Sequence, residues 1–80
     1  MDKKEYIQRL AKFLIDTGTT MHVRELAHLL NWNGFRTNYD TEFQGSRGTY
    51  TLISATYQWL MDRGQEAEAE QVARASERPR

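Results

Sequence analysis

Residues 20–64 decide the fold: they begin with Thr20-Met-His-Val-Arg-Glu-Leu-Ala-His-Leu-Leu-Asn-Trp-Asn-Gly34 and end with Thr49-Tyr-Thr-Leu-Ile-Ser-Ala-Thr-Tyr-Gln-Trp-Leu-Met-Asp-Arg-Gly64. In both stretches apolar side chains recur at helical spacing, and a glycine follows the last of them. The two stretches therefore predict two amphipathic helices that end at Gly34 and Gly64. Their buried faces are predicted to consist of Val23, Leu26, Ala27 and Leu30 in the first helix and of Tyr50, Ile53, Tyr57, Leu60 and Met61 in the second.

The starts of these two helices are marked less clearly than their ends. His22 stands three residues before Glu25, where an N-cap is expected, although histidine caps less well than serine or threonine. Thr49 follows a glycine-rich segment, and its hydroxyl is predicted to cap the later helix. The polar face of that helix is predicted to carry uncharged hydrogen-bonding side chains, namely Thr51, Ser54, Thr56 and Gln58.

Two further helices flank this central region. Residues 3–16 have apolar side chains at helical spacing, with Asp2 as the predicted N-cap and Gly18 as the predicted stop. Residues 65–75 have good helix propensity but a thin apolar stripe, so we expect a weaker fourth helix that packs lightly. Residues 76–80 are expected to fray into solvent, so the chain is predicted to form one small helical domain over 1–76 with a frayed tail at 77–80.

The connection over residues 35–48 resists a helical interpretation. Its side chains alternate between apolar or small and polar, which favours short extended pieces, and Tyr39-Asp40 is predicted to turn the chain. Phe35 and Phe43 are expected to pin the segment to the helices, and whether it forms a hairpin stays open. The predicted fold is therefore mainly α: a three-helix bundle of helix-turn-helix type with a weaker fourth helix and a long, partly extended turn between helices 2 and 3.

Composition narrows the function. Eighty residues leave little room for an internal catalytic cavity, and the absence of cysteine excludes disulfides and thiolate zinc sites and suits a cytoplasmic chain. The charged start and the lack of a long apolar run predict neither a signal peptide nor a membrane span. Lys and Arg balance Asp and Glu at 11 each, which disfavours a strong stand-alone DNA binder, although acidic residues gather near the C-terminus and leave the first two thirds mildly basic.

The pattern Glu25-Leu-Ala-x-Leu-Leu-Asn31, followed by Gly34-Phe35-x-Thr37, resembles the helix-turn-helix segment in the recombinase domain of large serine recombinases and in small accessory proteins of phages and plasmids. Phe35 stands where that family usually has an aliphatic residue, and Asp40 where it usually has glycine. Nothing in the chain resembles the catalytic serine domain. The resemblance implies a DNA-binding module of a mobile element, with the helix after Thr49 in the recognition position.

The position of residues around that helix suggests which of them contact a ligand. Arginine suits bidentate contact with guanine, and serine and threonine suit phosphates or bases. The predicted DNA- or partner-binding residues are Arg36, Asn38, Ser46, Arg47, Thr49, Thr51 and Trp59. The plain alternative is that the loop residues form a solvated turn and a helix cap. A module this small and uncharged is expected to need a homodimer or a second protein to bind DNA specifically.

A second function fits the same scaffold. The chain is alternatively a protein-interaction module or inhibitor that binds a host protein complex through the 36–50 loop and the third helix. Trp32 and Trp59 are either core-edge residues or partner anchors, and Trp59 is the better candidate for exposure because it lies off the apolar stripe. His22 and His28 are six residues apart and lie on different helix faces, so no metal site, cofactor or enzymatic activity is predicted.

Overall fold

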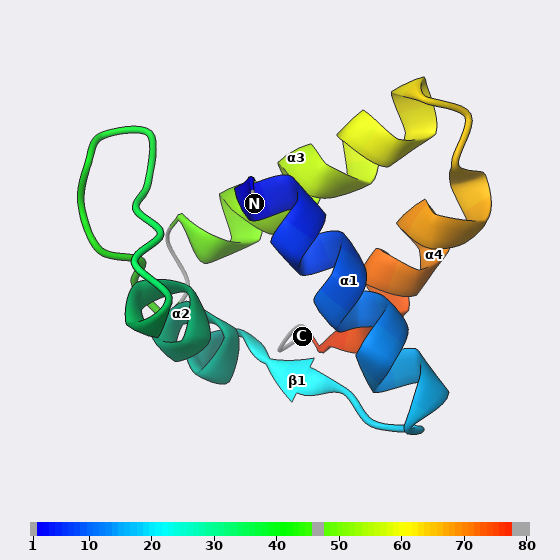
Figure 1. Ribbon diagram of the computed structural model, residues 1–80, viewed down its shortest axis with the longest axis horizontal. Coiled ribbons are helices and arrows are strands. Elements are labelled where there is room, and N and C mark those ends of the chain that lie inside the picture. Colours follow the sequence, from blue (N-terminus) through cyan, green and yellow to red (C-terminus); the bar gives the residue numbers. More distant parts are fainter. Residues whose placement is uncertain (1, 46–47, 78–80) are drawn as a thin grey trace.

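The structure is a computed structural model that describes residues 2–45 and 48–77. Helices form most of the described chain (Figure 1), in the order α1 (Lys3–Asp16), β1 (Met21–His22), α2 (Val23–Trp32), α3 (Thr49–Asp62), α4 (Glu66–Ala75) and β2 (Ser76–Glu77). The predicted mainly α fold, with a fourth helix and a long connection between α2 and α3, is confirmed. In these residues no helix combines the length and apolar character needed to cross a membrane.

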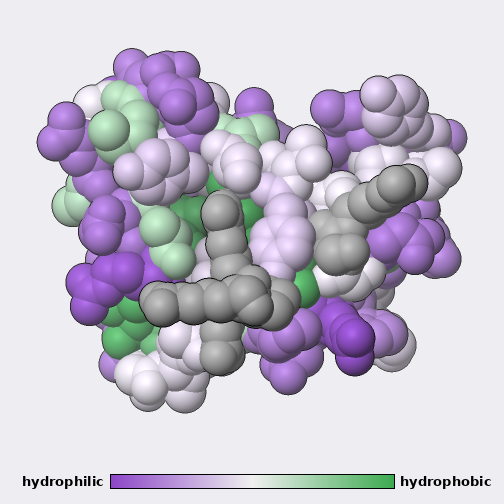
Figure 2. All heavy atoms as spheres, turned by 180° about the vertical axis from the view of Figure 1, so that it is seen from behind, coloured by the Kyte–Doolittle hydropathy of each residue, from purple (hydrophilic) through white to green (hydrophobic). Residues whose placement is uncertain are grey.

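The core lies where α1, α3 and α4 meet, and α2 covers one end of it (Figure 1). Seen from behind, most of the visible face is hydrophilic or neutral, with smaller hydrophobic areas (Figure 2). Among the described elements, α1 and α4 share the most extensive contact, so the prediction that the fourth helix packs lightly is wrong. The reason is the small size of its buried residues, since alanine lets two helix backbones approach closely. The buried residues of α4 are Ala69, Val72 and Ala75.

The end of α4 continues into a short pair of strands. Ser76 pairs with Met21 and Glu77 with His22 in a parallel arrangement, which joins β2 to the start of α2 through β1. The expected fraying is therefore wrong for residues 76 and 77, because their backbone groups find partners in β1. Residues 78–80 of the predicted tail lie outside the described part of the chain.

Two of the three predicted helix caps are confirmed. The Asp2 side chain accepts a hydrogen bond from the Lys4 amide at 3.4 Å, and His22 Nδ1 accepts one from the Arg24 amide at 3.2 Å. The third prediction is wrong, because the N-cap of α3 is Gly48 and Thr49 is already helical. Gly48 has a φ of +77°, a conformation that glycine adopts without the steric cost that other residues meet. The stops predicted at the ends of α1, α2 and α3 are confirmed by positive φ angles at Gly18, Gly34 and Gly64.

The buried side of α2 matches its predicted stripe, whereas that of α3 is broader than predicted. Thr56, expected on the polar face, is fully buried and donates its hydroxyl proton to the Leu52 carbonyl oxygen at 2.7 Å. Leu52 is buried as well, whereas Tyr50 and Tyr57 are only half-buried. The stripe differs because α3 contacts α1, α2 and α4, so more than one side of the helix is covered.

Candidate functional site

The loop between α2 and α3 is held in place by one side chain of α2. Asn31 Nδ2 donates to the Phe43 carbonyl oxygen at 3.0 Å, and Asn31 Oδ1 accepts from the Phe43 amide at 2.7 Å. The Phe43 ring is buried in the core, with 5% of its surface exposed. This pair of hydrogen bonds fixes the far end of a loop that otherwise stands away from the helices (Figure 1). We call it the Asn31 clamp.

The loop itself is a turn rather than a hairpin. Thr37 and Thr41 bond to each other through their hydroxyls at 2.7 Å and through the Thr37 amide and the Thr41 carbonyl oxygen at 2.9 Å. Asp40 completes the predicted turn with a φ of +61°, the one described non-glycine residue with a positive φ. Aspartate tolerates this left-handed conformation better than most residues do. Residues 35–45 contain no paired strands, and among the described residues at the end of the loop, Gln44 and Gly48 form an isolated bridge.

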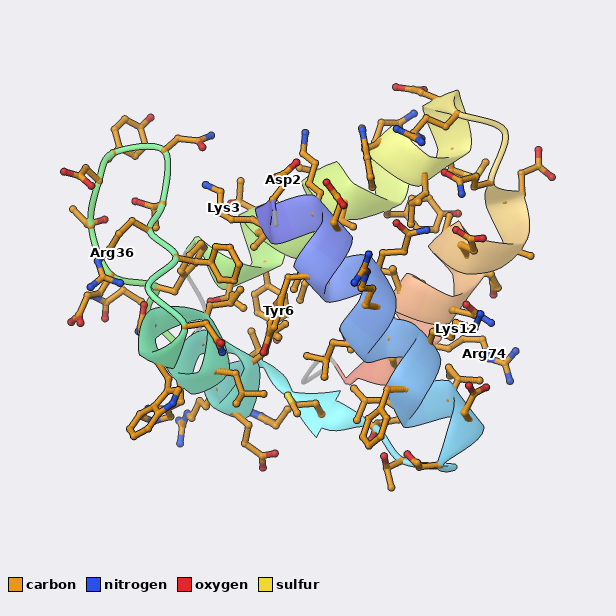
Figure 3. The ribbon with its side chains drawn as sticks, in the orientation of Figure 1. Asp2, Lys3, Tyr6, Lys12, Arg36 and Arg74 are labelled. Carbon is orange, nitrogen blue, oxygen red and sulfur yellow. The ribbon has the colours of Figure 1, made fainter. Side chains whose placement is uncertain are left out.

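The start of α1 fastens the near side of the loop. Lys3 points toward the segment that carries Arg36 (Figure 3), and its Nζ donates to the Arg36 carbonyl oxygen at 2.8 Å and to Asn38 Oδ1 at 3.1 Å. The same ammonium lies 5.9 Å from the centre of the Phe43 ring. A single lysine therefore connects both sides of the loop to α1.

Both aromatic residues that were expected to pin the loop do so. Phe43 is buried, and Phe35 is half-buried with its ring centre 5.2 Å from that of Tyr6. The neighbouring Arg36 is half-buried as well, and its Nη1 donates to the Phe35 carbonyl oxygen at 2.7 Å. Arg36 and Asn38 are thus brought together beside Lys3, as a small polar group at the base of the loop.

Of the remaining predicted site residues before and at the start of α3, the structure describes Thr49. Thr49 is fully buried, and its hydroxyl donates to the Gln44 carbonyl oxygen at 2.7 Å, so it closes the turn before α3 and presents nothing to a ligand. The prediction of Thr49 as a contact residue is therefore wrong, because its side chain is fully buried. Ser46 and Arg47 lie outside the described residues.

The exposed face of α3 is uncharged over its first two turns. Thr51, Ser54 and Gln58 lie on this face and are exposed, and we call them the α3 surface. Gln58 Nε2 donates to Asp62 Oδ1 at 2.9 Å, which links the surface to the first charged residue of the helix. A face of hydroxyls and an amide can donate and accept hydrogen bonds, and it raises no charge barrier to a polyanion.

The relative exposure of the two tryptophans is the reverse of the prediction. Trp59 is half-buried against the core, and the Arg63 guanidinium lies 4.6 Å from the centre of its ring, whereas 89% of Trp32 is exposed. The prediction that Trp59 is the more exposed of the two is wrong. Helical spacing already carried the signal, because Trp32 follows His28 by four residues and Arg24 by eight, and so lies on the polar face of α2.

Sequence reasoning also missed Tyr39, of which 89% is exposed, and the structural role of Lys3. Among the described residues, no group of three or more His, Cys, Asp or Glu side chains could hold a metal ion. A comparison of the chain with protein-family models, curated proteins and solved structures finds no match. Function is therefore inferred from the geometry and chemistry of these residues.

Proposed function

We propose that the protein is a small non-enzymatic helix-turn-helix DNA-binding accessory or regulatory protein of a mobile element, of the phage or plasmid kind, that places the α3 surface against duplex DNA. The observation that carries this proposal is the composition of that surface. Thr51, Ser54 and Gln58 are exposed on one helix face without an intervening charge. Helices of ordinary solvated surfaces carry mostly charged residues there, whereas a base-reading face needs donors and acceptors.

The start of α3 supports the same function. Its N-cap is a glycine, so the cap residue has no side chain to bond the first amides, and the first turn contains no acidic residue. The start of a helix carries a partial positive charge, which no carboxylate in the first turn of α3 offsets, and this favours an approaching phosphate. Lys3 and Arg36 add positive charge at the base of the loop that precedes it.

Two features of the loop also agree with the resemblance to the recombinase helix-turn-helix. Asp40 adopts a left-handed conformation at the position where that pattern usually has glycine, so the backbone there has the form that glycine favours. Asn31, one of the residues carried over from the pattern, forms the clamp that positions the segment before α3. These are the structural roles that such a motif needs to hold a recognition helix.

Two substitutions of Thr51 test the α3 surface, because they add charges of opposite sign and are expected to change DNA affinity in opposite directions. Thr51→Glu is expected to weaken binding to duplex DNA at least tenfold at low salt, because a carboxylate would face the phosphates. Thr51→Arg is expected to tighten binding and to steepen the salt dependence by about one unit of slope. Because an acidic side chain in the first turn of a helix favours the helix, loss of binding by Thr51→Glu would not be a loss of folding.

The matched control is Ala73→Glu, which makes a similar charge change at an exposed position of α4. Fluorescence anisotropy with labelled duplex measures all three variants. The α3 surface is the contact surface if only the substitutions at Thr51 change affinity beyond the control. Equal effects at Thr51 and Ala73 would mean that only net charge matters, and the proposed surface would be abandoned.

Binding to a host protein complex through the 36–50 loop and the third helix is the second candidate function. The observation that favours it is the exposure of Tyr39 at the turn of this loop, since exposed aromatic residues commonly anchor protein partners. With Trp59 packed against the core, Tyr39 takes its place as the candidate anchor. If this function is correct, Tyr39→Ala abolishes capture of the partner from a host lysate, whereas Thr51→Glu leaves DNA-independent capture unchanged.

A further inference from the structure

The solvent-facing side of α2 carries charged and aromatic residues that take no part in the proposed DNA contact. Arg24, His28 and Trp32 follow one another at intervals of four residues, and all three are exposed, Trp32 to 89%. Glu25 lies beside them and is exposed as well. We call these four residues the α2 ridge. A tryptophan this exposed on a regular helix leaves a large apolar ring in water, where burial against a partner would be favourable.

We propose that the α2 ridge binds a second copy of this chain, with the two α2 helices antiparallel and crossing at His28. The order of residues on the ridge favours this occupant. A cation stands four residues before His28 and an aromatic ring four residues after it. A twofold axis at His28 therefore places Arg24 of each copy over Trp32 of the other, and the same cation–π contact forms twice.

The charges of the ridge also favour a second copy over a strongly charged partner. Arg24 and Glu25 carry opposite charges, so a partner of one sign would face a like charge at one of them. In the antiparallel arrangement Glu25 of one copy lies toward Asn31 of the other. Neither the two Arg24 side chains nor the two Glu25 side chains are brought face to face. The formal net charge of zero also means that two copies do not repel each other at long range.

The arrangement is compatible with ordinary helix packing. Residues spaced by four form ridges that interdigitate in the commonest packing class, with helix axes about 8–10 Å apart. Because Cα atoms lie about 2.3 Å from a helix axis, the two His28 Cα atoms at the crossing would be about 3.4–5.4 Å apart. This distance overlaps the range of about 4.4–6.8 Å that a disulfide bridges.

A cysteine at the crossing tests the geometry directly, because the chain contains no other cysteine. His28→Cys is expected to form a disulfide-linked dimer under mild oxidation, seen by non-reducing electrophoresis at micromolar protein and in the absence of DNA. Phe13→Cys is the control, since Phe13 is also exposed, on α1. The proposal is overturned if the two variants cross-link at the same slow rate.

An exchange of the two contact residues tests the antiparallel pairing. Trp32→Arg alone sets an arginine over Arg24 of the other copy and is expected to weaken dimerisation at least tenfold in sedimentation velocity, and Arg24→Trp is then added to it. The double variant that carries both substitutions restores the cation–π pairs in each half of the interface, so its dimerisation should return to within about threefold of the original. A monomeric wild-type chain at high concentration, or an exchange that restores nothing, would exclude the second copy and leave the ridge to a different protein.

The dimer and the proposed DNA function can fail separately. Cross-linking and sedimentation are measured without DNA, and none of the three substituted α2 residues belongs to the α3 surface. If dimerisation is confirmed while Thr51→Glu has no effect on DNA binding, the α2 interface remains and the DNA contact is rejected. If Thr51→Glu weakens DNA binding while no dimer is detected, the α2 interface is rejected and the chain binds DNA as a monomer or through another protein.

Discussion

Phe43→Ala is expected to lower the free energy of unfolding by about 3–5 kcal/mol, the usual loss for a buried phenylalanine. The Phe43 ring is 5% exposed and anchors the loop to the core, so its removal leaves a cavity and frees the loop together. A domain of this size has a total stability of about 4–12 kcal/mol, so this one change removes a large part of it. Urea denaturation followed by circular dichroism measures the effect.

Phe13→Ala provides the matched control, because it deletes the same side chain at a position that is 62% exposed. It is expected to change the free energy of unfolding by less than about 1 kcal/mol. If Phe43→Ala proves too unstable to measure, Phe43→Leu keeps an apolar side chain and should cost less than the alanine substitution. Equal losses for Phe13→Ala and Phe43→Ala would contradict the placement of Phe43 in the core.

Asn31→Ala is the second substitution with a large expected effect, a loss of about 2–4 kcal/mol. It removes both hydrogen bonds of the Asn31 clamp and leaves the amide and the carbonyl of Phe43 without their side-chain partner, and each unsatisfied buried group costs about 1–3 kcal/mol. The same denaturation experiment measures this loss. Near-ultraviolet circular dichroism would also report the loosened Phe43 ring.

Two comparisons separate the clamp from a general effect of losing an amide. Asn38→Ala removes an exposed side chain that accepts from Lys3, and it should cost less than about 1 kcal/mol. Asn31→Asp keeps the acceptor for the Phe43 amide but turns a carboxylate oxygen toward the Phe43 carbonyl, so it should not restore the stability lost in Asn31→Ala. Full recovery by Asn31→Asp would show that only the amide contact matters.

The helices could be predicted from the sequence because their signals are local. The apolar stripe of α2, the caps at Asp2 and His22 and the glycine stops each depend on residues within a few positions of one another, and all are confirmed. The buried side of α3 was harder to predict, because Thr56 is covered by helices that are distant in the sequence. Small polar residues such as threonine are tolerated in a core when their hydroxyl finds a carbonyl, and sequence spacing does not reveal this.

The candidate site was predicted only in part, for similar reasons. Arg36 and Asn38 were placed correctly in the loop between α2 and α3, but their connection to Lys3 spans more than thirty residues and no local pattern indicates it. Thr49 was predicted to be a helix cap or a contact residue because it follows a glycine. The N-cap is instead Gly48, and Thr49 is fully buried. The exposure of Trp32, in contrast, could be predicted, because its spacing from Arg24 and His28 places it on the polar face of α2.

The proposed DNA contact of α3 is tested most directly by titrating the wild-type protein into labelled random-sequence duplex, from low to near-physiological salt. Because phosphate contacts release counterions, we expect binding at low salt and a logarithm of the binding constant that falls linearly with the logarithm of the salt concentration, by about 0.9 for each phosphate contacted. Absence of binding at low salt, or binding that does not change with salt, would contradict the central proposal.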